Sequence, residues 1–393
     1  MKVLIYLKKS ALEPKGGPNA VGYYIYKELE SRGITYISFI EDEDRKDEDR
    51  KDEGKSSCKS RLYLWLQQIA RVINRYKRFS KAFKRGGFSI VDLNRYDVVH
   101  FHKTVDMYEC RRSLESYKGI VILTSHSPVP LSKEFYDEQL TSFEKKYLRR
   151  FYSKLIRMDE YAFNRADFIH FPCEEAEEPY YNNWKGYEQI ARLRAEHYVY
   201  IPTGIPPVSP KRSRAEVRRE LSIPENDFYV SYVGRHNSVK GYDILKAIGQ
   251  KVISANTWVV VAGKEYPMQG LNNSHWIEVG WTNDAHSYIA ASDVFVLPNR
   301  ETYFDIVMLE VLSLGRIVVA SRTGGNRYFE KFGPCGIFLY DTVDEAVDII
   351  NRIQQMSQEE RKVLGELNKK LFGENFTAEI FVNRYCRFVS GLK

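Results

Sequence analysis

Residues 292–325 read SDVFVLPNRETYFDIVMLEVLSLGRIVVASRTGG, and this stretch decides the fold. It contains two short apolar runs, Val294–Leu297 and Ile317–Ala320, with a helical pattern through Glu310 between them. Continuous apolar runs that are rich in β-branched residues and separated by helices are typical of parallel strands covered on both faces. The stretch therefore predicts a strand–helix–strand unit, with Pro298 and an acidic loop after its first strand.

The same alternation extends in both directions along the chain. The apolar runs lie at 3–7, 34–40, 98–102, 120–124, 168–171, 198–201, 229–233, 258–262, 276–279, 294–297, 317–320 and 337–339. Two such series predict an α/β protein of two doubly wound, Rossmann-like domains. The segment 201–207, IPTGIPP, cannot continue a helix or a central strand and marks the seam. We therefore expect domains over 1–205 and 206–375, and a final helix over 376–393 that packs back on the N-terminal domain.

Cysteine usage and hydropathy exclude several classes of protein. The five cysteines are scattered and form no C-x-x-C pair, which disfavours a disulfide scaffold and suits a reducing cytoplasm. Only five apolar residues, Val3 to Leu7, precede Lys8, so the N-terminus predicts a first strand and not a signal peptide. No run approaches the roughly 20 apolar residues of a spanning helix. We expect a cytoplasmic protein, at most peripheral to the inner face of the cell membrane.

The net charge of +7 is concentrated in one segment. Residues 41–53 are acidic and without apolar side chains, so 41–60 is expected to be a disordered loop. Residues 61–85 contain eight Lys or Arg and no acid, with apolar residues at helical spacing, and 143–157 is a second basic stretch of this kind. A domain helix, a basic helix on an anionic membrane and a nucleic-acid contact are the three interpretations of 61–85. The second basic face strengthens the surface-binding interpretation beside that of a domain helix, and no nucleic-acid partner is expected.

The motif with the clearest chemistry is FYVSYVGRHNSVKG at 228–241. A predicted strand ends at Gly234, and Arg235 and Lys240 follow it five residues apart. The carboxyl ends of parallel strands border the crevice in which such folds bind ligands. A guanidinium fork beside an ammonium group suits a diphosphate.

Taken in order, these motifs resemble the retaining nucleotide-sugar glycosyltransferases of the two-Rossmann GT-B fold, glycosyltransferase family 4. The resemblance rests on Gly234-Arg235, on Lys240-Gly241, on the linker Ile201–Ile205 and on the pattern from Asp293 to Glu310. It implies transfer of a sugar from a nucleoside diphosphate sugar, a UDP-sugar foremost, with retention at the anomeric carbon. It also implies that Arg235 and Lys240 are catalytic, that no metal takes part, and that the acceptor is a lipid-linked or cell-surface glycan.

The chain departs from the family pattern in the loop after Pro298. The second family glutamate falls on Glu310, which implies a contact with the nucleotide ribose. The first falls on Thr302, while Glu301 lies one position earlier and Asp305 occupies the usual glycine position. Three interpretations follow: a bulge lets Glu301 serve the donor sugar as the catalytic carboxylate, Thr302 and Asp305 contact it instead, or catalysis is lost.

The resemblance carries over to further positions. It implies that Ile306 and its helix N-terminus meet the diphosphate, that Phe304 lines the donor site, and that Trp281 stacks on the base. In the N-terminal half it implies that Gly16 and Gly17 form a glycine loop at the donor, and that His126 acts beside the donor sugar. His100 and His102 are expected to be wall or packing residues. The alternative to an enzyme is a non-catalytic glycosyltransferase-like subunit that binds a glycan or a partner glycosyltransferase.

Overall fold

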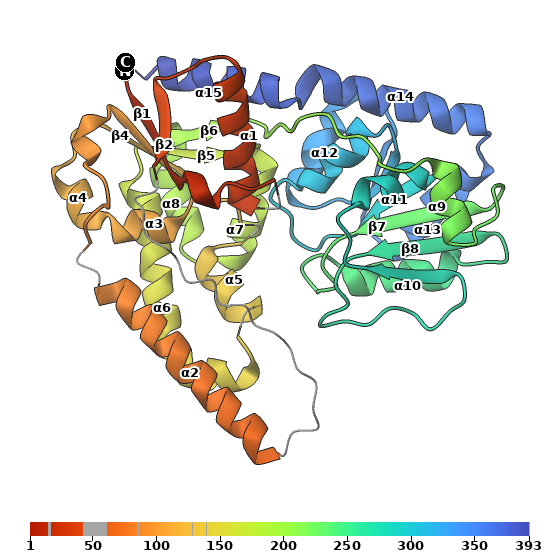
Figure 1. The fold of residues 1–393 in the computed structure, drawn as a ribbon, viewed down its shortest axis with the longest axis horizontal. Coiled ribbons are helices and arrows are strands. Elements are labelled where there is room, and N and C mark those ends of the chain that lie inside the picture. The colour runs from red at the N-terminus through yellow and green to blue at the C-terminus, as the bar shows by residue number, and fades with distance from the viewer. Residues whose placement is uncertain (15–16, 42–60, 85–86, 128, 139, 393) are drawn as a thin grey trace. The chain divides into compact units, whose positions relative to one another are not determined.

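The protein forms two compact units in the computed structural model, which describes residues 1–393 except 15–16, 42–60, 85–86, 128, 139 and 393 (Figure 1). The first unit comprises Met1–His170, Asn183–Val199 and Arg387–Lys393, and the second comprises Phe171–Asn182 and Tyr200–Cys386. The predicted acidic loop, 41–60, lies outside the described residues but for its first position. The predicted domain boundaries stay predictions.

The first unit is built on a parallel six-stranded sheet in the order β2-β1-β3-β4-β5-β6. Its strands are β1 (Val3–Lys8), β2 (Ile37–Ile40), β3 (Val98–Phe101), β4 (Ile120–Thr124), β5 (Phe168–Phe171) and β6 (Tyr198–Tyr200). Its helices are α1 (Gly17–Ser31), α2 (Arg61–Lys84), α3 (Thr104–Glu109), α4 (Arg111–Ser116), α5 (Leu131–Glu138), α6 (Ser142–Arg165) and α8 (Tyr187–Leu193), while α7 (Glu178–Asn183) belongs to the second unit except for its last residue. The described pairings of β1 with β2 and β3, and of β4 with β3 and β5, are parallel.

The second unit holds a second six-stranded sheet in the order β12-β11-β10-β7-β8-β9, with every pair parallel. Its strands are β7 (Phe228–Val233), β8 (Thr257–Ala262), β9 (Trp276–Gly280), β10 (Val294–Leu297), β11 (Ile317–Ser321) and β12 (Ile337–Tyr340). Its helices are α9 (Arg214–Glu220), α10 (Tyr242–Val252), α11 (Ala285–Ala291), α12 (Ile306–Ser313), α13 (Val343–Gln355), α14 (Gln358–Asn375) and most of α15 (Ala378–Ser390). Short 3-10 helices include Gly324–Phe332.

Both faces of the second sheet are covered, as alternation along β7 shows. Val230 and Tyr232 belong to a buried cluster with residues of α10 and α13. Tyr229, directly before Val230 on the strand, belongs to a cluster with residues of α9 and α11. Successive side chains of a strand point to opposite faces, so helices cover both sides. The α/β class predicted from continuous apolar runs is confirmed.

Chain order reverses at one place in each sheet. In the first sheet β1 lies between β2 and β3, and in the second β10 lies beside β7. Ligands of open α/β sheets bind outside the carboxyl ends of the strands at such switch points. Lys240 follows β7, and the loop at 298–305 follows β10, so the fold brings these two loops to the same switch point.

Residues 61–84 of the basic segment form α2, which packs against α6 in the first unit (Figure 1). Tyr76 makes an edge-on ring contact with the buried Phe151 at 5.0 Å between centroids, and Val72 packs against the same cluster. Arg75 Nε lies 2.8 Å from Glu144 Oε1, whose side chain is 2% exposed. One side of α2 is therefore fixed to the domain. Among the described helices, none is both long and apolar enough to cross a membrane.

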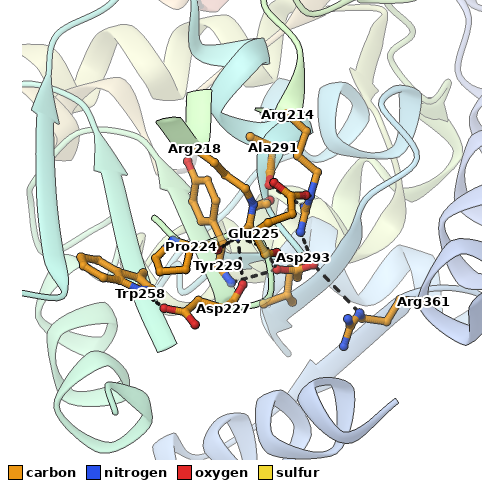
Figure 2. A network of polar contacts seen from close by, with 12 residues as sticks. Arg214, Arg218, Pro224, Glu225, Asp227, Tyr229, Trp258, Ala291, Asp293 and Arg361 are labelled. Carbon is orange, nitrogen blue, oxygen red and sulfur yellow. Dashed lines mark hydrogen bonds and ion pairs between the residues drawn. The ribbon is translucent and has the colours of Figure 1, made fainter. Parts of the chain in front are cut away.

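A network of polar contacts centred on Asp293 joins several segments of the second unit (Figure 2). The Asp293 carboxylate accepts hydrogen bonds from Arg214 Nη2 at 3.0 Å, from Arg218 Nη2 at 2.9 Å and from the backbone N–H of Tyr229 at 2.9 Å. Arg361 Nε lies 4.0 Å away, on α14. Asp293 therefore links α9, β7 and α14 to the start of β10.

Arg218 extends this network to the loop before β7. Its side chain is 1% exposed, and Nη1 donates to the carbonyl oxygens of Pro224, Glu225 and Asp227 at 2.7, 3.3 and 3.0 Å (Figure 2). Asp227 in turn accepts a hydrogen bond from Trp258 Nε1 at 2.7 Å. A buried guanidinium is tolerated because these acceptors and one carboxylate surround it.

We predict that Asp293→Ala lowers the free energy of unfolding by about 3–5 kcal/mol, because it leaves the Arg218 charge buried and uncompensated. Urea unfolding followed by circular dichroism measures the change. The matched control is Asp344→Ala, which removes an exposed pair with Lys251 and should cost at most about 1 kcal/mol. Equal losses in the two variants would contradict a central role for Asp293.

Candidate functional site

Gly241 lets the loop after β7 touch the loop after β10. Its φ is +62°, and a Cβ at this position would lie 1.7 Å from the carbonyl oxygen of Pro298. The backbone N–H of Arg300 also donates to the carbonyl oxygen of Val239 at 3.0 Å. Only glycine combines this conformation with so close an approach. The Gly of the sequence motif is thus explained by main-chain contact between the two loops.

This contact places Lys240 against Asp305. Lys240 Nζ lies 2.7 and 2.6 Å from the two carboxylate oxygens of Asp305, and Asn299 Nδ2 donates to one of them at 2.6 Å. Burial raises the pKa of Asp305, but the charge and hydrogen bond of Lys240 outweigh burial, with smaller contributions from Asn299 and Arg235, so its pKa lies below the usual value. Asp305 is therefore ionised at neutral pH.

Asp305 stands at the N-cap of α12, directly before Ile306. Its side chain makes no capping hydrogen bond to the first turn, because the carboxylate points to Lys240. A helix N-terminus carries partial positive charge and favours an anion. Lys240, the exposed Arg235 and the start of α12 therefore form one region of positive potential, with the Asp305 carboxylate inside it.

The residues between Pro298 and Asp305 differ sharply in exposure. Glu301 is partly exposed, whereas Thr302 has no exposed surface and its Oγ1 has no hydrogen-bond partner among the described residues. Phe304 is 7% exposed and stacks on Phe329 at 5.6 Å between centroids. The predicted donor contacts of Thr302 and Phe304 stay predictions, and they would require this segment to open. Glu301 and Asp305 are partly exposed, although Glu301 Oε2 is buried.

Two glycines hold this segment from the other side. A Cβ at Gly324 would lie 2.1 Å from the carbonyl oxygen of Thr302, and one at Gly325 would lie 2.0 Å from that of Tyr303. Gly325 N–H also donates to the Thr302 carbonyl oxygen at 3.2 Å. The Gly-Gly pair that ends the stretch 292–325 therefore allows the backbone to approach Thr302 and Tyr303 closely.

The predicted ribose and base contacts lie on neighbouring elements. Glu310, on α12, has a side chain that is 20% exposed, and its Oε1 lies 3.3 Å from His286 Nε2. His286 was missed by sequence reasoning, because no motif surrounds it. Trp281 follows β9 and is 70% exposed. The base and ribose roles of Trp281 and Glu310 stay predictions.

In the first unit, four histidines lie at the carboxyl ends of β3, β4 and β5. His102 Nδ1 lies 2.7 Å from His126 Nε2, with the rings stacked at 13°. Thr124 Oγ1 lies 2.7 Å both from His100 Nε2 and from His170 Nδ1. The sequence singled out His126 and treated His100 and His102 as packing residues. It missed His170, although His170 is the third residue of its strand, as His100 is.

Burial determines the charge of this histidine cluster, which comprises His100, His102, His126 and His170. It lowers the pKa of His126 to about 3, with smaller contributions from His170 and Lys103. It also lowers the pKa of His100 and His102 well below 6.5. These three rings are therefore neutral at pH 7 and can donate or accept hydrogen bonds. The predicted action of His126 beside the donor sugar stays a prediction.

The glycine loop can be placed only in part. Gly16 lies outside the described residues, and Gly17 is the first residue of α1, which follows β1 at its switch point. A role of these glycines at the donor stays a prediction. In the part of the chain that the structure describes, no group of three or more His, Cys, Asp or Glu side chains is arranged to hold a metal ion.

Comparison with protein families identifies the class of this protein. The family model described as Glycosyltransferase Family 4 matches residues 15–209, and the one described as Glycosyl transferases group 1 matches residues 227–359. Together the two models cover most of the chain. The protein belongs to the group 1, family 4 glycosyltransferases, as the motifs of its sequence predicted.

Curated relatives are distant. The chain is 25% identical over 217 residues to the lipopolysaccharide 1,2-N-acetylglucosaminetransferase of Salmonella typhimurium, a match that covers 49% of this chain and 56% of the relative. It is 24% identical over 185 residues to the N-acetyl-alpha-D-glucosaminyl L-malate synthase of Bacillus anthracis, covering 44% and 48%. The chain thus spans about half the length of these relatives.

A solved structure supports the GT-B fold over the whole chain. Sucrose-phosphate synthase from Thermosynechococcus elongatus superposes with a TM-score of 0.64 at 16% identity, covering 100% of this chain and 99% of that one. Identity this low shows the fold alone. The predicted fold of two Rossmann-like domains is confirmed.

We predict that the first unit loses stability as the pH falls below about 6.5. The unfolded chain takes up protons on these histidines near pH 6.5, whereas the folded chain resists protonation of His126 down to about pH 3. At about pH 5 this one histidine should cost about 2 kcal/mol relative to pH 7.5. Urea unfolding at both pH values measures the difference.

The variant His126→Gln cannot take up this proton and should show a smaller loss between the two pH values, whatever its absolute stability. Val99→Ala, a neutral change at a fully buried position on β3, should lower stability equally at both. A pH dependence that His126→Gln leaves intact would contradict the assignment.

Proposed function

We propose that the protein transfers a sugar from a nucleoside diphosphate sugar, a UDP-sugar foremost, to a hydroxyl group of a lipid-linked or cell-surface glycan. The observation that carries the proposal is Lys240, held at the N-terminus of α12 where β7 and β10 reverse the chain order. Because the chain belongs to the group 1, family 4 glycosyltransferases, we interpret Lys240 as a group that binds the donor diphosphate. The similar fold of Anabaena Alr3699/HepE, solved in complex with UDP (TM-score 0.60, 15% identity), supports the choice of nucleotide.

In this proposal, Lys240, Arg235 and the start of α12 stabilise the charge that builds on the departing diphosphate. Positive groups held near the leaving group by the fold stabilise developing negative charge effectively. The reaction proceeds with retention and without a metal ion, with the acceptor attacking on the side from which the nucleotide leaves. Glu301 is the proposed carboxylate at the donor sugar, because it is a partly exposed acid one position from the family glutamate.

The non-catalytic alternative has one specific observation in its favour. Asp305 places a carboxylate on Lys240, where a donor diphosphate would need to bind. The half-buried Lys240 and Glu310 argue for the enzyme, since a subunit that only binds a partner has no need of either.

We predict that the wild-type protein releases a nucleoside diphosphate from one member of a panel of UDP-, GDP- and ADP-sugars when acceptor glycans are supplied. Lys240→Ala should lower turnover at least about 100-fold, because it removes a charge from the leaving group. The matched control is Lys251→Ala on α10, which removes an exposed lysine paired with Asp344 and should leave turnover unchanged. Calorimetry that detects no nucleotide binding to any variant would reject the enzyme.

We further propose that α2 and α6 bring the protein to an anionic membrane that carries the acceptor. Trp65, Leu66 and Ile73 on α2 are 51%, 51% and 47% exposed, and Leu66 and Ile73 share one side of the helix. The exposed Lys and Arg residues around them include Arg71 and Lys77. Val72 packs against the buried cluster of α6, and Leu66 and Ile73 lie on a different side of α2 from Val72. Trp65, two turns before Val72, lies on the side of Val72 but is exposed. An exposed apolar stripe flanked by cations suits a lipid surface better than a nucleic acid.

α6 adds to this surface. Tyr147 is 56% exposed, and Lys146, Arg149, Arg150 and Lys154 are exposed around it. The cations attract acidic headgroups, and the aromatic ring suits the interfacial depth of a bilayer.

We predict that the protein floats with vesicles containing an anionic lipid and not with neutral vesicles. The triple change Trp65→Ser, Leu66→Ser and Ile73→Ser should abolish flotation, because it removes the apolar stripe and leaves every charge in place. Leu193→Ser, at a position 65% exposed on α8, is the control and should float as the wild type does. Unchanged flotation of the triple variant would reject this surface, and salt-sensitive DNA binding would favour nucleic acid instead.

A further inference from the structure

Asp305 forms an ion pair with Lys240, the cation that the diphosphate of the proposed donor would bind. An ammonium group has three N–H donors. The two Asp305 oxygens lie 2.7 and 2.6 Å from Lys240 Nζ, so two of the three donors are directed at this carboxylate. Because Asp305 is ionised, it neutralises the charge that would attract a diphosphate.

The ion pair between Lys240 and Asp305 can exchange a partner for an ion from solvent, unlike the contacts of the Asp293 network. Asp293 and Arg218 have side chains that are 9% and 1% exposed, and their contacts join several elements. The side chains of Lys240 and Asp305 are 21% and 16% exposed, so an ion from solvent can reach them. Asp305 does not cap α12, and the helix does not depend on its carboxylate for a hydrogen bond.

The position of the pair makes Asp305 a mimic of a phosphate. Its carboxylate lies where the start of α12 and Lys240 converge, and Asn299 supplies a third donor at 2.6 Å. An anion of a ligand would meet the same three groups. It would also meet the Asp305 charge at a few ångströms, where repulsion between unit charges remains substantial at protein dielectric constants.

We propose that Asp305 is an internal competitor for the donor diphosphate: it occupies Lys240 in the free protein, yields it when the nucleotide binds, and takes it back as the nucleotide leaves. The inference rests on the proposed function, whose donor site it concerns. The competition weakens binding of the donor and of the released nucleoside diphosphate alike. It therefore favours rapid product release, the step that often limits turnover.

The experiment compares the wild type with Asp305→Asn and Asp305→Gly. Calorimetric titration with inorganic pyrophosphate tests the anion site independently of the base, and titration with UDP, GDP and ADP tests the nucleotide. Both variants should bind pyrophosphate and the preferred nucleotide at least about tenfold more tightly, because the competing charge is gone. In steady-state turnover, KM for the donor should fall, while kcat stays level or falls because product leaves more slowly.

Asp243→Asn is the charge-matched control. Asp243, on α10, pairs with Arg300 at 2.7 Å and is 44% exposed, so its loss removes one nearby negative charge without freeing Lys240. It should change pyrophosphate affinity much less than Asp305→Asn does. A similar gain in both variants would show a general charge effect and overturn the proposal.

The remaining outcomes separate this inference from the proposed function. If the wild type binds a nucleotide and both Asp305 variants bind it no more tightly, Asp305 is no competitor and the enzyme assignment stands. A fall in kcat with unchanged KM would instead make Asp305 a contact of the donor sugar. If only the Asp305 variants bind, competition is confirmed in its strongest form. If no variant binds pyrophosphate or any nucleotide, the donor site itself is rejected, and the inference falls with it.

Discussion

The carboxylate of Asp293 is the interaction on which the geometry of the second unit depends. It lies at the start of β10 and accepts hydrogen bonds from α9 and from the backbone of β7, the strand with which β10 pairs at the reversal of chain order. The carboxyl ends of these two strands carry Lys240 and the loop at 298–305. The buried Asp293, at the amino ends of β7 and β10, therefore helps to position Lys240 and the loop at 298–305 at their carboxyl ends.

Two ion pairs of the second unit, Asp293 with Arg218 and Asp305 with Lys240, differ in burial. Around Arg218, burial is nearly complete and every acceptor belongs to the protein, so any loss leaves a charge stranded. At Lys240, exposure to solvent means that the partner is replaceable. In this chain the Asp293 pair is a fixed part of the domain, whereas the exposure of the Lys240 pair is what our proposal of exchange rests on.

The sequence predicted the architecture and the family well, for physical reasons. Buried parallel strands need continuous apolar runs, and Lys240-Gly241 could be recognised because Gly241 is fixed by backbone contact with Pro298. The side-chain geometry was beyond the same reasoning. Nothing in the order of residues shows that Asp305 turns to Lys240 and not to its own helix, that Thr302 is fully buried, or that His102 stacks on His126. These features depend on which side chains the folded backbone brings together.

The glycine contacts have a consequence for how this protein can evolve. The loop at 298–305 is located by main-chain atoms of Pro298, Thr302 and Tyr303 against Gly241, Gly324 and Gly325. Its position is therefore specified in part by main-chain contacts, in addition to the buried side chains of Thr302 and Phe304. Substitutions such as the acid at 305 can accumulate there while the backbone stays in place. The same frame can thus acquire new donor preferences through changes of single residues, with no need to rebuild the fold.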